Sequence, residues 1–297
     1  MSEINYKSIA PFYDIAASEK EDAKLWKGLI KEIKHQKNQP LIIYELGIGT
    51  GRVLEQLLDE LTPEDKYIGI DISKELLSIL ERKIKRWCTE IGTLPKIEIW
   101  SQDMRELTNK IEPKADLIIC PYSTLQHLTW NERKDLYKIV YSILNSKGIF
   151  VFDDSTPSLS KIKANSNVIK LWIGPVLIYF DKGLNCYQIV RSPNTSEKYL
   201  YTLSYVSTWD EVKKCQKFTW IAEYWNNSNF HRIIQIHYYY PIPPLQTVLD
   251  LSKVGFINIE VWTGYGRKSQ INWETEGTII IKAVKGGDKC QIILIIY

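Results

Sequence analysis

The sequence predicts an α/β fold, in which a seven-stranded sheet has a parallel, doubly wound core of five strands and carries an antiparallel β insertion after the fifth strand. Two observations lead to this prediction. Between residues 41 and 153, apolar runs of strand length alternate with segments whose apolar residues recur at helical spacing, as in parallel sheets with crossover helices. Between residues 166 and 240, strand-like runs follow one another without helices, which is typical of an antiparallel sheet.

The first 40 residues are expected to form a helical cap. One run of apolar residues at helical spacing is closed by Pro40, and its members are Leu25, Trp26, Leu29, Ile30 and Ile33. The strands expected next lie at 41–46, 66–71, 96–101, 115–120 and 149–153. A helix over 52–61 follows the first strand, and a second begins at Ser73, a plausible N-cap. Thr129 and Glu132 have the spacing of a capping box and open a third helix.

The segment after residue 166 contains the insertion. Its strand-like runs cover 168–180, 198–209, 217–225 and 231–240. A helix from Pro244 to Gly255 and strands at 256–262 and 278–284 then complete the seven-stranded sheet. The expected organisation is therefore a cap over 1–40, a ligand-binding core over 41–160, the insertion over 161–243 and the last core elements over 244–297.

Composition and charge narrow the function classes. The net charge is +3 and the isoelectric point is about 8.4, which is too mild for a strong nucleic-acid signal. Five scattered cysteines without C-x-x-C pairs predict neither a disulfide framework nor a zinc site, so a reducing cytoplasm is the expected location. No apolar run reaches the length of a membrane span.

The turn after the first strand, Glu45-Leu-Gly-Ile-Gly-Thr-Gly51-Arg52, indicates a ligand. It lacks the lysine and hydroxyl of a phosphate-binding loop. Its third glycine comes too early for the dinucleotide fingerprint. Asp71 stands 20 residues after Gly51, at the end of the second strand, where an acid can accept hydrogen bonds from ribose hydroxyls.

The E-x-G-x-G-x-G spacing resembles motif I of the class I S-adenosylmethionine-dependent methyltransferases, which have a Rossmann-like fold. Asp71-Ile72 resembles the ribose-binding motif II, and Gln102-Asp103-Met104 resembles the segment that brackets the adenine. Cys120-Pro121-Tyr122-Ser123 stands at the motif IV position beside the reactive methyl. The resemblance implies S-adenosyl-L-methionine as cofactor, with S-adenosyl-L-homocysteine as product. It assigns these residues to the cofactor: Tyr13, Glu45, Gly47, Gly49, Gly51, Arg52, Asp71, Ile72, Asp103, Met104 and Pro121.

A subgroup resemblance points to a small-molecule acceptor. Pro11-Phe12-Tyr13-Asp14, the Ser123 to Leu128 loop and the His237 to Phe256 run are similar to sugar N-methyltransferases and glycine N-methyltransferase-like enzymes. His127 is then the candidate general base, since its ordinary pKa lies near neutral pH. Tyr122 and Tyr13 are candidates to close over the cofactor or orient the acceptor. An amine and a hydroxyl both remain open as the methylated group.

Several alternatives remain open. The chain could methylate RNA or protein, or bind S-adenosylmethionine without turnover. Asp153 and Asp154 look like a catalytic pair, but neighbouring strand residues point to opposite faces, so a solvated strand end and no metal site are expected. The insertion could shape the acceptor site or serve as a homodimer surface.

Overall fold

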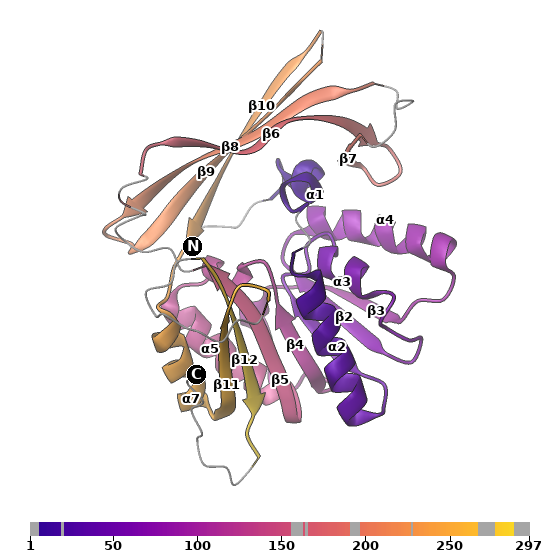
Figure 1. Ribbon diagram of the computed structural model, residues 1–297, viewed down its shortest axis with the longest axis vertical. Coiled ribbons are helices and arrows are strands. Elements are labelled where there is room, and N and C mark those ends of the chain that lie inside the picture. Colours follow the sequence, from indigo (N-terminus) through magenta and orange to yellow (C-terminus); the bar gives the residue numbers. More distant parts are fainter. Residues whose placement is uncertain are drawn as a thin grey trace.

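The structure is a computed structural model that describes residues 6–18, 21–155, 163, 166–190, 197–226, 228–266 and 277–287. Two sheets are present, and the smaller one lies over one end of the larger (Figure 1). The larger, sheet A, has the strand order β11-β12-β5-β4-β1-β2-β3. Its strands are β1 (Ile42–Leu46), β2 (Lys66–Asp71), β3 (Lys96–Ser101), β4 (Ala115–Cys120), β5 (Leu144–Ser155), β11 (Phe256–Thr263) and β12 (Thr278–Lys285).

Strands β1 to β5 pair in parallel, whereas β12 is antiparallel to both β5 and β11. The predicted fold class, a seven-stranded α/β sheet followed by an antiparallel insertion, is confirmed. The structure places β1 between β4 and β2, where the strand order reverses. Ligands of open α/β sheets bind outside the carboxyl ends of the strands at such a reversal.

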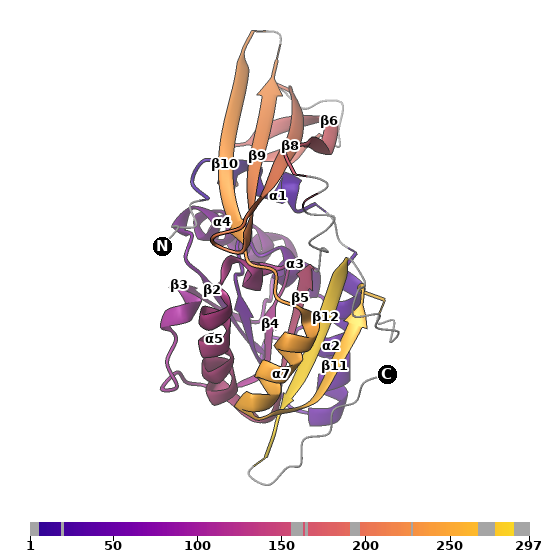
Figure 2. The same cartoon turned by 90° about the vertical axis from the view of Figure 1, so that its left-hand side faces the viewer.

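Helices cover both faces of sheet A (Figure 2). On one face lie α2 (Ala23–Lys37), α3 (Arg52–Leu57) and α4 (Lys74–Ile91), and on the other lie α5 (Trp130–Ile143) and α7 (Pro244–Val254). The two predicted N-caps are present, because Ser73 accepts the Leu76 N–H and Thr129 forms a capping box with Glu132. Helix α3 is shorter than the predicted 52–61, because the chain leaves it through a turn in which Glu60 N–H donates to Leu57 O.

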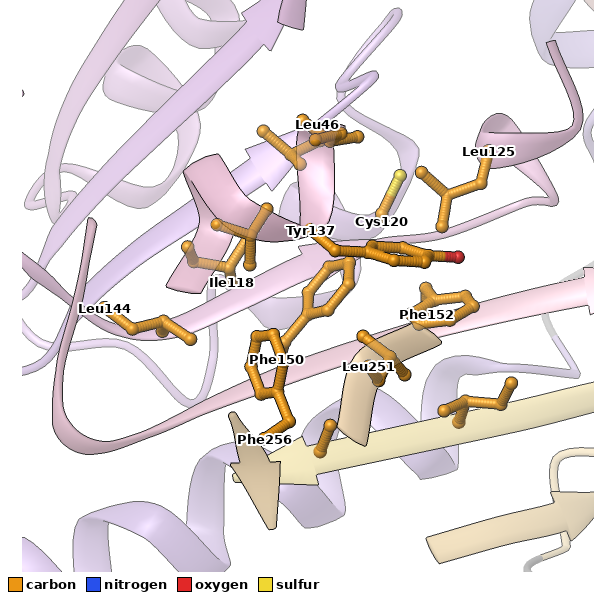
Figure 3. Close-up of a cluster of buried hydrophobic side chains, with 14 of the residues drawn as sticks. Leu46, Ile118, Cys120, Leu125, Tyr137, Leu144, Phe150, Phe152, Leu251 and Phe256 are labelled. Carbon is orange, nitrogen blue, oxygen red and sulfur yellow. The ribbon is translucent and has the colours of Figure 1, made fainter. Parts of the chain in front are cut away.

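The alternating strand residues build two cores, one on each face. Ile43 packs with α2, α3 and α4, while its neighbour Tyr44 packs on the α5 and α7 side. Figure 3 shows part of the second core, in which Phe150 and Phe152 of β5 meet Tyr137 of α5 and Leu251 of α7. A rigid, fully packed sheet therefore fixes the loops at its carboxyl edge.

The insertion forms sheet B, an antiparallel sheet in the order β10-β9-β8-β6-β7. Its strands are β6 (Ile169–Asp181), β7 (Cys186–Ile189), β8 (Tyr199–Asp210), β9 (Cys215–Trp225) and β10 (Phe230–Tyr239). Four of them follow the predicted runs, and the short β7 was missed. The inner face of sheet B packs on the N-terminal segment η1 (Ala10–Phe12) and α1 (Tyr13–Ala16), which in turn contacts α4.

Four cysteines lie in the described residues and all are free thiols, while Cys290 lies outside them. Among the described helices, none has the length and apolar character needed to cross a membrane.

Candidate active site

A cavity of about 800 Å³ lies between the carboxyl edge of sheet A and the inner face of sheet B. Its floor is made by residues that follow the parallel strands, among them Gly47, Asp71, Gln102 and Tyr122. Its roof is a set of side chains on sheet B that we call the aromatic wall: Trp172, Tyr205, Phe218, Trp220 and Tyr239. The volume is that of a small-molecule site.

The glycine turn brings bare backbone to this floor. Gly47 has a φ of +75° and lines the cavity. A Cβ at Gly47 would lie 2.5 Å from Thr124 Cγ2, so a side chain would collide with the loop after β4. The turn is held in place because the Gly47 and Ile48 N–H groups both donate to Ile70 O at the end of β2. Its backbone is thus fixed before any ligand arrives.

Asp71 lies next to the turn, at the end of β2. One carboxylate oxygen accepts the Gly49 N–H at 2.8 Å, and the other accepts the Ser73 N–H at 2.8 Å. Burial raises the pKa of this carboxyl, while hydrogen bonds from the backbone of Ser73 and Gly49 oppose the rise. The carboxylate also lines the cavity, where its remaining lone pairs can accept hydrogen bonds from a diol.

Asp103 follows β3 and also lines the cavity. It caps η2 (Met104–Glu106) by accepting the Arg105 N–H, and the Arg105 guanidinium donates to both of its oxygens. Burial raises its pKa, but the hydrogen bonds from Arg105 prevail and lower it. Arg105 also pairs with Glu132 at 2.6 Å. This charged cluster positions Met104 and Asp103 beside Ile72, at the edge expected to hold a purine.

The loop after β4 is strained. Tyr122 and Ser123 have φ values of +60° and +53°, which residues with a Cβ rarely adopt and which cluster at functional sites. The Tyr122 hydroxyl donates to Ala16 O, and the Arg52 guanidinium lies over its ring at 4.8 Å. Arg52 is also bound by both oxygens of Asp22 at 2.7 and 2.8 Å. The neighbouring elements therefore force this loop into its geometry.

His127 ends η3 (Thr124–His127), on the cavity wall. Its Nε2 atom is 3.1 Å from the Tyr6 hydroxyl, and its ring packs against His237 and Tyr239. Burial, followed by the nearby His237 and Arg133, lowers the pKa of His127 to about 3. The imidazole is therefore neutral at pH 7 and can accept a hydrogen bond.

Asp153 and Asp154 correct one expectation, because both carboxylates are buried rather than solvated. They do point to opposite faces of β5. Asp154 pairs with Arg133 at 2.6 Å and accepts from Gln126. Asp153 lines the cavity and accepts from the Tyr265 hydroxyl at 2.7 Å and the Ser123 N–H at 3.2 Å. The loop at Ser123 and the Tyr265 side chain thus contact the Asp153 carboxylate, which the sequence could not show.

The structure brings most of the predicted site residues to one cavity. Its lining includes Tyr13, Gly47, Asp71, Ile72, Asp103, Met104, Tyr122 and His127. Five others are not among the lining residues, namely Glu45, Gly49, Gly51, Arg52 and Pro121. The Glu45 carboxyl accepts from the Tyr67 hydroxyl at 2.6 Å, and burial raises its pKa to about 8.

Sequence reasoning missed Tyr6, Tyr265 and the aromatic wall as cavity residues. Tyr6 and Tyr265 carry no local signal, since only the tertiary fold brings them to the floor. Asp153 did carry one: it stands at the carboxyl end of a parallel strand, where ligands of such sheets bind. Within the described residues, no three His, Cys, Asp or Glu side chains gather as metal ligands would.

Comparison with known proteins agrees with this geometry. Residues 43–148 match the methyltransferase domain family. An uncharacterised methyltransferase of Oceanobacillus iheyensis is 26% identical over 223 residues, covering 73% of this chain and 93% of that protein. A carboxy-S-adenosyl-L-methionine synthase of Nitratiruptor sp. is 26% identical over 209 residues, covering 69% of this chain and 76% of that protein.

Solved structures share the fold over nearly the whole chain. An S-adenosylmethionine-dependent methyltransferase from Clostridium acetobutylicum has a TM-score of 0.67 at 20% identity, covering 95% of this chain and 99% of that one. CalS10, an amino pentose methyltransferase from Micromonospora echinaspora, has a TM-score of 0.62 at 12% identity, covering 96% and 99%. The similarity therefore extends beyond sheet A into the β insertion.

Proposed function

Since the chain is an S-adenosylmethionine-dependent methyltransferase, we propose that it methylates a small molecule, on an amine or a hydroxyl. The observation that carries this proposal is that side chains of sheet B enclose the cavity at the carboxyl edge of sheet A. Sheet B stands above the carboxyl edge of sheet A, so the cofactor and the acceptor share a cavity of about 800 Å³. The amino pentose acceptor of CalS10 is a small molecule of this kind.

The residues on the floor fit the cofactor. The Gly47 backbone leaves room at the turn, and the Asp71 carboxylate on the cavity floor suits the ribose diol. Ile72, Met104 and Asp103 border the place for the adenine. When bound, S-adenosyl-L-methionine supplies an electrophilic methyl group on a sulfonium, so the protein has mainly to position the acceptor and exclude water.

We further propose that His127 orients the acceptor. A neutral imidazole with a pKa near 3 accepts a hydrogen bond readily but holds a proton poorly. His127 would therefore receive the N–H or O–H of the acceptor without becoming a stable imidazolium. Tyr13 and Tyr122, whose rings border the cavity, would close over the cofactor. Burial raises the pKa of Tyr13, so its hydroxyl stays protonated and can donate.

Methylation of a small molecule, methylation of RNA or protein, and cofactor binding without turnover differ in which molecules receive the methyl group. Methyl-labelled cofactor incubated with a fractionated cell extract should label small metabolites; label confined to RNA or protein would overturn the proposal. A protein that binds the cofactor without turnover would label nothing. The product of the Nitratiruptor relative carries an added carboxylate, which the acids on this cavity wall disfavour (Glu21, Asp71, Asp103, Glu132 and Asp153).

The variant His127→Ala tests the orienting role. We expect kcat to fall about 10- to 100-fold at every pH, because a lost hydrogen bond misplaces the acceptor, while cofactor affinity stays unchanged. A kcat near that of the wild type would contradict the assignment.

We also propose that two copies of the chain meet through the outer face of sheet B. The antiparallel register places Leu171, Ile221 and Ile234 on this outer face, on strands β6, β9 and β10. Leu171 and Ile234 are 59% and 60% exposed, and contiguous exposed apolar patches mark interaction sites. Sedimentation analysis should give a dimer that Ile234→Lys dissociates; a wild-type monomer at tens of micromolar would refute this proposal.

A further inference from the structure

The cavity carries an excess of negative charge. Its described lining contains the carboxylates Glu21, Asp71, Asp103, Glu132 and Asp153, against the two cations Arg105 and Lys170. Arg105 is already bound by two of these acids, Asp103 and Glu132. A phosphorylated or nucleotide-linked acceptor needs cationic donors for its phosphates. The excess of carboxylates in the cavity lining favours a cationic ligand instead.

Asp153 is the acid on this wall that most needs a ligand to explain it. Its side chain is buried, and among the described residues it makes no ion pair, in contrast to Asp154 with Arg133. Its partners are one hydroxyl, from Tyr265, and one backbone N–H, from Ser123. A buried carboxylate without a cation is costly, unless a cationic ligand completes the site.

The aromatic wall faces the same cavity. Trp172 and Trp220 meet edge to face with their ring centroids 5.2 Å apart, and Phe218 lies 5.0 Å from Tyr239. The faces of such rings attract cations and pack against apolar groups. One cavity thus offers a buried acid and several aromatic rings, which is the combination that recognises an organic ammonium.

We propose that the methyl acceptor is a free, unphosphorylated amine that enters as an ammonium ion, and that Asp153 receives this ammonium group. The inference rests on the proposed small-molecule methyltransferase function and names its substrate class. Asp153 takes one proton from the ammonium, and the lone pair left on nitrogen forms the new N–C bond to the methyl group. The pair of the broken C–S bond stays on sulfur, which becomes a neutral thioether, and the carboxylic acid later loses its proton to water.

The electrostatic surroundings suit this proton transfer. Burial raises the pKa of Asp153 to about 6, partly opposed by hydrogen bonds from Tyr265 and the Ser123 backbone. The more distant charges act in both directions, since Asp22 raises this pKa and Arg52 lowers it, and the Cys120 thiol beside Asp153 stays neutral because burial raises its own pKa. Asp153 is therefore ionised at pH 8, yet more basic than an ordinary carboxylate.

Binding of sinefungin tests the role of Asp153 without any acceptor. This analogue carries an amine where S-adenosyl-L-methionine carries its reactive methyl. We expect the wild type to bind sinefungin about tenfold or more tightly than S-adenosyl-L-homocysteine at pH 8, and to lose most of that preference at pH 5. In Asp153→Asn the preference should fall to within about threefold, while affinity for S-adenosyl-L-homocysteine stays unchanged.

Two variants serve as comparisons. Asp135→Asn removes an exposed acid of α5 and should keep the preference intact. Tyr265→Phe removes a donor that lowers the pKa of Asp153, so the loss of preference should move to higher pH. A preference for sinefungin that survives in a folded Asp153→Asn variant would overturn the inference.

A panel of acceptors separates this inference from the function on which it rests. With labelled cofactor, methylation of free amines and not of alcohols or nucleotide sugars supports both. Methylation of alcohols or nucleotide sugars alone overturns the amine inference and leaves the small-molecule function standing. Label found only in macromolecules overturns the function itself, whatever the outcome with sinefungin.

Discussion

Replacement of Asp71 by alanine should weaken cofactor binding through the loss of two hydrogen bonds. Each carboxylate oxygen already accepts one backbone N–H, from Gly49 or Ser73. The carboxylate lines the cavity, so its remaining lone pairs can accept from the ribose hydroxyls. A hydrogen bond to a charged group contributes about 1.5–3 kcal/mol. Because the ribose hydroxyls return to water in the variant, we expect a total loss of about 2–4 kcal/mol, or about 30- to 1,000-fold in Kd.

Isothermal titration calorimetry with S-adenosyl-L-homocysteine measures this loss directly. Ser73→Ala is the matched control, because it also disturbs the start of α4 by removing the cap on Leu76 N–H but leaves the carboxylate in place. We expect Ser73→Ala to cost about 1 kcal/mol of stability and to change Kd less than about threefold. The reasoning is refuted if Asp71→Ala binds as tightly as the wild type, or if both variants weaken binding equally.

Three further predictions concern stability. Gly51 has a φ of +77°, and a Cβ there would collide with Leu80 of α4, so Gly51→Ala should lower the free energy of unfolding by about 2–4 kcal/mol. Gly264, with a φ of +62°, lies in open space, so Gly264→Ala should cost only about 1 kcal/mol. Equal losses for the two variants in urea denaturation would contradict the collision. Burial lowers the pKa of His237 to about 4. Because the unfolded chain binds this proton near pH 6.5 and the folded chain only near pH 4, stability should fall as the pH drops through that range, by about 1–2 kcal/mol from pH 7 to 5 for this residue alone. Burial also lowers the pKa of His127, so His237→Leu should reduce the slope of the profile without abolishing it, and an unchanged slope would contradict the prediction. Burial raises the pKa of Asp153 to about 6, above its unfolded value, so its contribution to stability is lost as pH rises through 6. At pH 8 the free energy of unfolding of Asp153→Asn should therefore exceed that of the wild type by about 1–3 kcal/mol. An equal or lower free energy of unfolding would count against a buried charge.

The sequence predicted sheet A well because its signals are local. The strands are short, largely apolar runs, and two helix starts have a chemical marker, Ser73 and the Thr129 capping box. The glycine turn was predicted to bind the cofactor because its spacing differs from that of phosphate-binding and dinucleotide-binding turns, and the structure gives Gly47 a positive φ. Elements of this kind are decided by residues within a few positions of one another.

The parts that the sequence did not predict depend on contacts between distant segments. Asp153 was expected to be solvated because nothing near it in the chain indicates that Ser123 and Tyr265 will contact its buried carboxylate. Tyr6 meets His127 across 121 positions, and Tyr265 meets Asp153 across 112. The four-residue strand β7 was missed because so short a run carries no period that could be recognised.

The central claim is that the cavity between the two sheets holds the cofactor on Asp71 with its reactive end toward Asp153. A crystal structure with S-adenosyl-L-homocysteine bound tests this claim most directly. We predict that the ribose hydroxyls lie within hydrogen-bond distance of the Asp71 carboxylate and that the sulfur faces the Tyr122–Ser123 loop, on the side where Asp153 lines the cavity. A ligand bound outside this cavity, or one whose sulfur points away from Asp153, would contradict the account.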